Sequence, residues 1–190
     1  KDLRILLAGF REHKVAQRYQ ANQGTRVVQT VEGRRLMHQY NCIGCHEIEG
    51  RGGFIRKYYQ ENPTLAPPVL NGEGEKVQSQ WLFSFLKSPV PIRPWLELRM
   101  PTFGFSNEHT GQLVDFFNNL SKVEFPFTYF DGKRVPPEYL DAAKKLVSKD
   151  YFNCFSCHQQ GDRKPEGPVE GWAPDLTLAR HRLNPSWIIK

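Results

Sequence analysis

The sequence predicts an all-α protein made of two helical modules in tandem, with the second module incomplete at its C-terminus. Three observations support this prediction. The length of 190 residues suits one large domain or two small ones. Apolar residues recur at helical spacing in several stretches. The order of motifs in the first half of the chain is repeated in the second half.

We divide the chain into an N-terminal segment, a first module, a linker and a second module, at residues 1–30, 31–124, 125–136 and 137–190. The N-terminal segment has apolar residues on one helical face, namely Leu3, Leu6, Leu7 and Phe10. This short predicted helix looks like the closing helix of a preceding module, and residues 20–29 predict a polar connector. We therefore expect the chain to be a fragment or one part of a larger protein.

Three helices are predicted in the first module. One runs from about Val31 into the first cysteine motif, and one spans residues 79–87, where the prolines that follow end it. The third begins near Ser106, a residue type that caps helix N-termini. Its apolar positions follow the helical period at Leu113, Phe116, Phe117 and Leu120. The glycine-rich stretch 47–62 predicts a loop.

The second module is predicted to begin with a helix. Pro137 suits a first helical turn, and Leu140, Ala143 and Val147 share one face of the helix that leads toward the second cysteine motif. Residues 186–189 predict another helix. The repeat between the modules continues between these helices, because Pro68, Leu70 and Trp81 recur at the same spacing as Pro174, Leu176 and Trp187.

Composition excludes several classes of function. The chain has 26 Lys and Arg against 20 Asp and Glu, a net charge of +6, but these charges are scattered. No basic stripe of the kind found in nucleic-acid-binding proteins is present, so no nucleic-acid partner is expected. The longest apolar run, residues 5–10, is far shorter than the roughly 20 residues of a membrane-spanning helix, so no transmembrane segment is expected in this chain.

The four cysteines indicate the chemistry. They form two copies of Cys-x-x-Cys-His, one at Cys42, Cys45 and His46 and one at Cys154, Cys157 and His158. This pentapeptide is the attachment sequence of c-type haem. Two thiols three residues apart lie on one side of a helical turn, so each can add to one vinyl group of the same haem. The histidine that follows places its imidazole beneath the iron as the proximal ligand.

Paired cysteines have two other common uses. A zinc site normally has its cysteine pairs about 15–20 residues apart, whereas here Cys42 and Cys154 are 112 positions apart. A disulfide or a thioredoxin-like redox motif leaves both histidines as coincidences and calls for a βαβ pattern, which this sequence lacks. Haem attachment explains both motifs in full and is the favoured interpretation.

With their surroundings, these motifs resemble class I cytochrome c, twice over. That family's order of parts is a helix, Cys-x-x-Cys-His, a Pro-x-Leu loop, a Trp-bearing helix, Met-Pro-x-Phe and a closing amphipathic helix. Residues 31–122 contain all of these parts, and the second module contains those up to the Trp-bearing helix. The resemblance implies a dihaem cytochrome, or two modules of a larger multihaem cytochrome.

The resemblance implies a role for each matched residue. In module 1 the haem is held by Cys42 and Cys45, with His46 as proximal ligand and Met100 as sixth ligand. The carbonyl of Pro68 is expected to accept a hydrogen bond from His46 and so fix its ring. In module 2 the corresponding residues are Cys154, Cys157, His158 and Pro174. Met37 lies on an apolar helical stripe and is expected in the core.

The sixth ligand of the second haem is not identified by the sequence, because no methionine follows His158. Three possibilities stay open: a methionine supplied by chain beyond residue 190, a histidine of this chain, or a five-coordinate iron with an open face. His181 is the histidine closest to the second motif, but its position matches a non-ligand and it is expected at the surface. The remaining histidines, His13, His38 and His109, are expected to be solvated.

The favoured function is one-electron transfer between redox partner proteins by two covalently bound c-type haems. The alternative is that an exchangeable distal face at haem 2 makes the protein a peroxidase-like enzyme or a sensor of small ligands. A third interpretation is a haem-bearing subunit of a respiratory complex. The resemblance also implies a periplasmic or otherwise extracytoplasmic location, because haem is attached to such motifs outside the cytoplasm.

Overall fold

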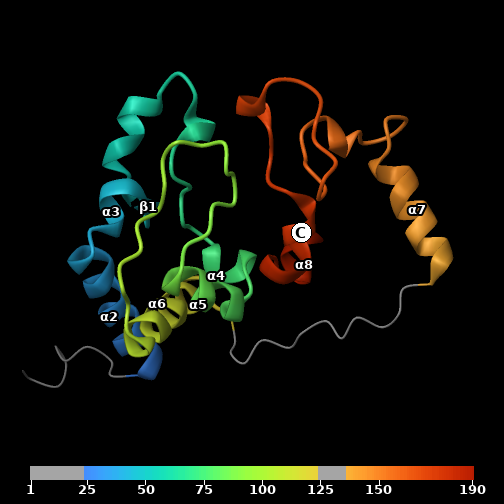
Figure 1. Ribbon diagram of the computed structural model, residues 1–190. Helices are drawn as coiled ribbons and strands as arrows, with labels where there is room; N and C mark the ends of the chain where they lie inside the picture. Colours follow the sequence, from blue (N-terminus) through green and yellow to red (C-terminus); the bar gives the residue numbers. More distant parts are fainter. Residues whose placement is uncertain (1–23, 124–135) are drawn as a thin grey trace, which may run out of the picture.

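The computed structural model describes residues 24–123 and 136–190, which we call the first unit and the second unit (Figure 1). The helix predicted at residues 3–10, His13 and almost the whole predicted linker lie outside the described residues. Both units are built mainly from helices, as the sequence predicts. None of the helices in the described ranges has both the length and the apolar character required to cross a membrane.

Two crossing helices form the centre of the first unit, α2 (Thr25–Gln39) and α6 (Asn107–Leu120). They approach closely because Gly33 has no side chain: a Cβ placed there would lie 2.2 Å from the Cβ of Phe116. Helices α4 (Glu73–Lys76) and α5 (Ser79–Lys87) pack against α6. The buried core between these helices includes Leu36, Met37, Leu82, Leu86, Leu113, Phe116 and Phe117.

The predicted helices of the first unit are present, with one boundary corrected. Helix α5 has the predicted bounds, and Ser106 caps α6 as expected, because its Oγ accepts a hydrogen bond of 3.1 Å from the His109 amide. Helix α2, however, begins at Thr25, within the predicted polar connector. Polar contacts explain the difference: Gln29 donates to Asp115 on α6 over 2.8 Å and accepts from Asn119. Such contacts leave no apolar pattern in the sequence.

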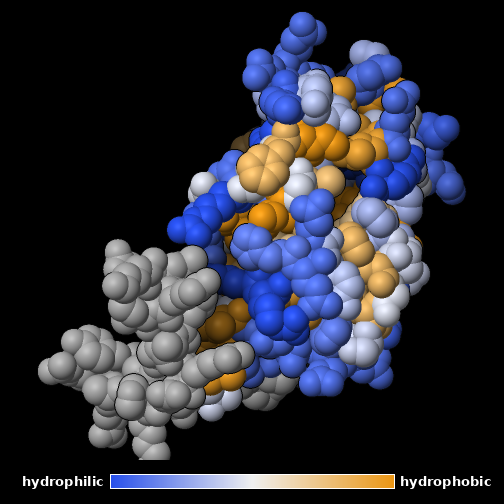
Figure 2. All heavy atoms as spheres, turned by 90° about the vertical axis from the view of Figure 1, so that its left-hand side faces the viewer, coloured by the Kyte–Doolittle hydropathy of each residue, from blue (hydrophilic) through white to orange (hydrophobic). Residues whose placement is uncertain are grey.

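The predicted loop 47–62 contains short regular elements. Strands β1 (Glu47–Ile48) and β2 (Arg51–Gly52) form a two-residue antiparallel hairpin. The hairpin turns through Glu49 and Gly50, both of which have positive φ angles. Two 3-10 helices follow, η2 (Phe54–Tyr59) and η3 (Pro63–Leu65). The segment has no α-helix, as the glycines predicted, but it folds back onto the first cysteine turn. In Figure 2, hydrophobic areas interrupt an otherwise hydrophilic surface on the face that carries α2 and α3.

The second unit is made of short elements. Its first helix, α7 (Pro137–Val147), begins at the predicted proline, and its last, α9 (Pro185–Ile188), overlaps the predicted helix 186–189. Between them lie 3-10 helices η4, η5 and η6 and helix α8, at Cys154–Ser156, Val169–Gly171, Leu176–Leu178 and Ala179–Arg182. The apolar face of α7 is exposed, so within the described residues it lacks the cover that α6 gives to α2.

The two units contact each other where α4 joins α5 and where α8 joins α9 (Figure 1). At this junction Val77 and Leu183 form an antiparallel β-bridge. A second contact joins Trp95 of the first unit to Trp172 of the second, with ring centroids 5.7 Å apart in an edge-on arrangement. The units therefore form one continuous body, despite the short elements of the second unit.

Candidate functional site

The first Cys-x-x-Cys-His motif forms one tight turn at the end of α2. Asn41 takes a left-handed conformation (φ 53°) that separates α2 from α3 (Cys42–Cys45). The amide of His46 then donates to the carbonyl of Cys42 over 2.8 Å. Both cysteines are free and partly buried. The turn therefore brings two thiols and one imidazole together from five consecutive residues.

The His46 ring is held by a single backbone acceptor. Its Nδ1 donates to the carbonyl oxygen of Pro68 over 2.8 Å. Burial lowers the pKa of His46, although the Pro68 carbonyl acts in the opposite direction. The ring is therefore neutral at pH 7, with its proton on Nδ1. The lone pair of Nε2 is left available to a metal ion.

The thiols of this turn do not have the properties of redox or zinc-binding cysteines. Burial raises the pKa of Cys42 to about 11, whereas reactive redox thiols need a lowered pKa. Across residues 24–123 and 136–190, no cluster of three or more potential metal-ligating side chains of the His, Cys, Asp or Glu type is formed. The described residues thus do not bring the two cysteine pairs together as a four-ligand zinc site.

Met100 is partly buried and packs against the core of the first unit, together with Phe103, Trp81 and Cys42. It lies in the extended segment between α5 and α6. Met37, by contrast, is buried in α2, which confirms the prediction of a core role. Of the two methionines, only Met100 belongs to a loop beside the cysteine turn.

An aromatic cluster supports the segment that follows Met100. Tyr40 makes edge-on contacts with Phe103 and Phe105, at centroid distances of 5.9 and 4.7 Å. Its hydroxyl is hydrogen-bonded to Nδ1 of His109 over 2.9 Å. The prediction that His109 is a solvated side chain is therefore wrong, because α6 turns this ring inward to meet α2. His38 and His181 are exposed, as expected.

The second Cys-x-x-Cys-His motif repeats the local geometry of the first. Asn153 is also left-handed (φ 49°), and the His158 amide donates to the Cys154 carbonyl over 2.9 Å. Nδ1 of His158 donates to the carbonyl of Pro174 over 2.7 Å. The next backbone link is repeated as well, since Leu70 N donates to Glu47 O and Leu176 N donates to Gln159 O, both over 2.8 Å.

The two turns also differ. Cys154–Ser156 is a 3-10 helix rather than an α-helical turn, and Cys157 is exposed whereas the other three cysteines are partly buried. The ring of Phe155 in this turn carries the guanidinium of Arg163 at 4.0 Å from its centroid. The second turn is therefore more open to solvent than the first.

Two residues of the turns were missed by the sequence reasoning. Asn41 and Asn153 directly precede the first cysteine of each motif, and each provides the left-handed residue that starts the turn. Asparagine is one of the few residue types that adopt this conformation readily. The signal was present, because the same residue type occupies the same position before both motifs.

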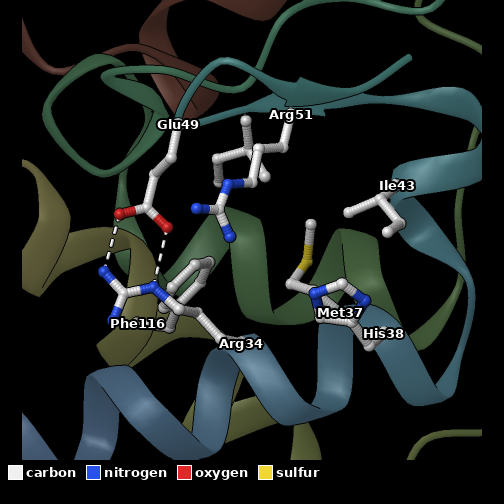
Figure 3. Close-up of a pocket in the computed structure, with 8 residues that line it drawn as sticks. Arg34, Met37, His38, Ile43, Glu49, Arg51 and Phe116 are labelled. Carbon is white, nitrogen blue, oxygen red and sulfur yellow. Dashed lines mark hydrogen bonds and ion pairs between the residues drawn. The ribbon is translucent and has the colours of Figure 1, made fainter. Parts of the chain in front are cut away.

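The first unit also has a surface pocket beside α2, lined by Arg34, Met37, His38, Ile43, Ile48, Glu49, Arg51 and Phe116 (Figure 3). None of the predicted site residues lines it. Arg34 is held by two contacts with the Glu49 carboxylate, of 2.8 and 2.6 Å. These contacts fasten the β1–β2 hairpin to α2 behind the cysteine turn.

Comparison with known proteins agrees with these features. The family model described as cytochrome c matches residues 30–121. Among curated proteins, the small C-type component named for the nitric oxide reductase of Stutzerimonas stutzeri is 24% identical over 103 residues, which are 54% of this chain and 66% of that relative. The chain thus spans just under two thirds of the length of this relative. No solved structure matches the chain at a significant level.

The helical fold and the Cys-x-x-Cys-His turn at its centre define a haem protein of the c type. More particularly, residues 30–121 are a cytochrome c domain. Such a domain implies a covalently bound haem c and a role in electron transfer.

Proposed function

We propose that the chain is a dihaem cytochrome that carries single electrons, with one haem in each unit. The observation that carries this proposal is the repeated histidine–proline pair. His46 donates to Pro68 over 2.8 Å, and His158 donates to Pro174 over 2.7 Å, each directly after a turn with two free thiols. A coincidence of sequence does not account for two identical three-dimensional arrangements.

The residues of the first unit fit a haem. Cys42 and Cys45 are unpaired thiols on one turn and would hold the two vinyl-derived arms. His46 would be the proximal ligand through Nε2, because Nδ1 is committed to Pro68. Met100 would be the sixth ligand from the opposite loop. Partly buried apolar side chains, among them Leu70 and Trp81, provide the dry surroundings that such a cofactor needs.

In this function the bound haem supplies an iron that cycles between Fe(II) and Fe(III). The chain's residues set the ease of that cycle. The Pro68 carbonyl keeps the His46 ring oriented and makes it a better electron donor. The buried core excludes water and so disfavours the extra positive charge of Fe(III), which raises the reduction potential. The thioether bonds of Cys42 and Cys45 retain the group through repeated encounters with partners.

In the second unit, we assign haem attachment to Cys154 and Cys157, the proximal ligand to His158 and its orienting carbonyl to Pro174. The domain limits proposed from the sequence, 31–124 and 137–190, follow from this assignment. Contacts across the Val77–Leu183 bridge keep the two units together, which would allow an electron to pass between them. The sixth ligand of this haem is left open.

We further propose an extracytoplasmic location and redox partner proteins for the chain. The similarity to one component of a nitric oxide reductase supports a role in a larger redox assembly. The charges are scattered, which favours recognition through a local surface around a haem edge rather than through net charge.

A redox titration of the purified holoprotein tests the electron-carrier proposal. We expect two one-electron transitions in the parent protein. The double variant Cys154→Ala/Cys157→Ala should keep one transition, and Cys42→Ala/Cys45→Ala should keep the other. A single transition in the parent that the Cys154→Ala/Cys157→Ala variant leaves unchanged would refute the second haem.

The second candidate function is a small-ligand-binding enzyme or sensor. It is favoured by the open second turn, in which Cys157 is exposed. Carbon monoxide added to the reduced protein separates the two functions. A spectrum that does not change supports the carrier, and a shift confined to the second haem supports the enzyme or sensor.

A further inference from the structure

The contact between the two units is nearly two-fold symmetric. Residues 76–78 and 182–184 occupy equivalent places in the repeat, five to three residues before Trp81 and Trp187. These two segments pair with each other. Gln78 N donates to Arg182 O over 2.8 Å, and Asn184 N donates to Lys76 O over 2.9 Å. The same surface is thus used by both units, as in the interface of a symmetric dimer.

Buried amide side chains reinforce this pairing from both sides. Nε2 of Gln78 donates to the carbonyls of Arg180 and Leu183 over 2.9 and 2.8 Å. Nδ2 of Asn184 donates to the carbonyls of Glu75 and Val77 over 2.8 and 3.0 Å. Both amides are less than a tenth exposed. The junction is therefore a specific interface rather than a loose contact.

Each unit also extends a cation over the tryptophan of the other unit. The guanidinium of Arg182 lies 5.2 Å from the centroid of the Trp81 ring. The ammonium of Lys76 lies 5.5 Å from the centroid of the Trp187 ring. Trp81 belongs to the cytochrome c domain and packs against the same core as Met100 and Cys42. Arg182 thus lies at the border of the first haem site, although it belongs to the second unit.

The Arg182 side chain lacks an adequate partner among the residues that the structure describes. Its Nε is buried without a hydrogen bond, and the side chain makes no ion pair within 4 Å. Burial lowers the pKa of Arg182, with Glu73 acting in the opposite direction. A desolvated guanidinium without a paired anion is costly. The surroundings of this side chain therefore call for an anion.

A second donor at the same junction is also unpartnered. The indole Nε1 of Trp95 is buried without an acceptor in the described chain, and its ring contacts Trp172 of the second unit. Glu73 links the junction to the haem turn, because its charge acts on both His46 and Arg182. Arg182 therefore lies on the His46 side of the first unit.

We propose that Arg182 binds a carboxylate of the haem in the first unit, so that the second unit completes the haem site of the first. The cofactor carries two propionates, which are the anions nearest in chemistry to what an unpaired guanidinium requires. The buried indole of Trp95 is a further donor for the same group. This inference rests on the haem of the cytochrome c domain and does not need a second haem.

The test is a redox titration of the full holoprotein with Arg182→Met, which removes the charge and keeps the length of the side chain. Arg180→Met is the matched control, because Arg180 is on the same helix and at its surface. We expect the potential of the first haem to fall in Arg182→Met, since a lost cation favours Fe(III), and to stay unchanged in Arg180→Met. Arg182→Lys should restore part of the shift.

The first haem is identified by the absorption band of methionine-ligated ferric haem, which Met100 would provide. Failure of this proposal is separable from failure of the proposed function. If the parent lacks that band, the proposed Met100 ligation fails, and the first haem is then followed alone in the Cys154→Ala/Cys157→Ala background. Equal shifts in the Arg182→Met and Arg180→Met variants, or a first-haem potential that does not move in Arg182→Met, overturn the role of Arg182.

Discussion

The Nδ1 atom of His46 lies 2.8 Å from the carbonyl oxygen of Pro68, 22 residues further along the chain. This hydrogen bond decides which ring nitrogen is free, because a neutral imidazole that donates through Nδ1 keeps its lone pair on Nε2. A local five-residue motif is thereby joined to a distant loop. The same relationship recurs between His158 and Pro174.

The first prediction concerns His46 itself. In His46→Ala the haem should stay attached through Cys42 and Cys45 but lose its proximal ligand. The absorption spectrum of the first haem should change from low-spin to high-spin. His38→Ala is the control, because His38 is exposed on α2. A low-spin spectrum retained in His46→Ala would contradict the proposed ligation.

The second prediction concerns the crossing of α2 and α6. A methyl group at Gly33 would lie 2.2 Å from the Cβ of Phe116, so Gly33→Ala should lower the free energy of unfolding by about 1–3 kcal/mol. Gly111→Ala in α6 is the matched control, since nothing lies within 4 Å of that position. It should be neutral or stabilising by up to about 1 kcal/mol. Urea denaturation of both holoproteins measures the difference, and equal midpoints would refute the close crossing.

Much of the first unit was predictable from its apolar pattern. The 3.6-residue period at Leu113, Phe116 and Phe117 gives α6 and its buried face, and Ser106 marks its start. The early start of α2 was not predictable, because Gln29 and Asp115 stabilise it by a hydrogen bond between residues far apart in sequence. A pattern of local hydrophobicity does not contain such contacts.

The third prediction concerns the aromatic support of the Met100 segment. Tyr40→Phe keeps the ring contacts with Phe103 and Phe105 but removes the hydrogen bond to His109. The free energy of unfolding should fall by about 0.5–1.5 kcal/mol. Tyr58→Phe serves as the control, because Tyr58 is 75% exposed. If chemical denaturation gives the same loss for both variants, the Tyr40–His109 bond contributes nothing.

The fourth prediction concerns the junction between the units. Asn184→Ala removes two hydrogen bonds and leaves the carbonyls of Glu75 and Val77 unpaired, at a cost of about 1–3 kcal/mol. Hydrogen exchange at the Gln78 amide, which donates across the junction, should become faster. Ser186→Ala, an exposed neighbour, should leave this exchange rate unchanged. Unchanged exchange in Asn184→Ala would mean that the units are not joined as described.

The candidate site was predictable in its chemistry but not in its surroundings. The two Cys-x-x-Cys-His motifs specify thiols and imidazoles by spacing alone. Their left-handed starting residues, Asn41 and Asn153, and the pairing of Val77 with Leu183 depend on backbone conformation and on how the repeats meet. For the same reason the position of Arg182 over Trp81 has no signature in the sequence.

The most direct test of the central claim is the intact mass of the purified protein under denaturing conditions, which keep thioether bonds and release any other haem. We predict the mass of the 22.1 kDa chain plus two haems, with one haem fewer in Cys154→Ala/Cys157→Ala. A mass equal to that of the bare polypeptide would contradict covalent haem attachment altogether. A single added haem that persists in this variant would contradict the second site.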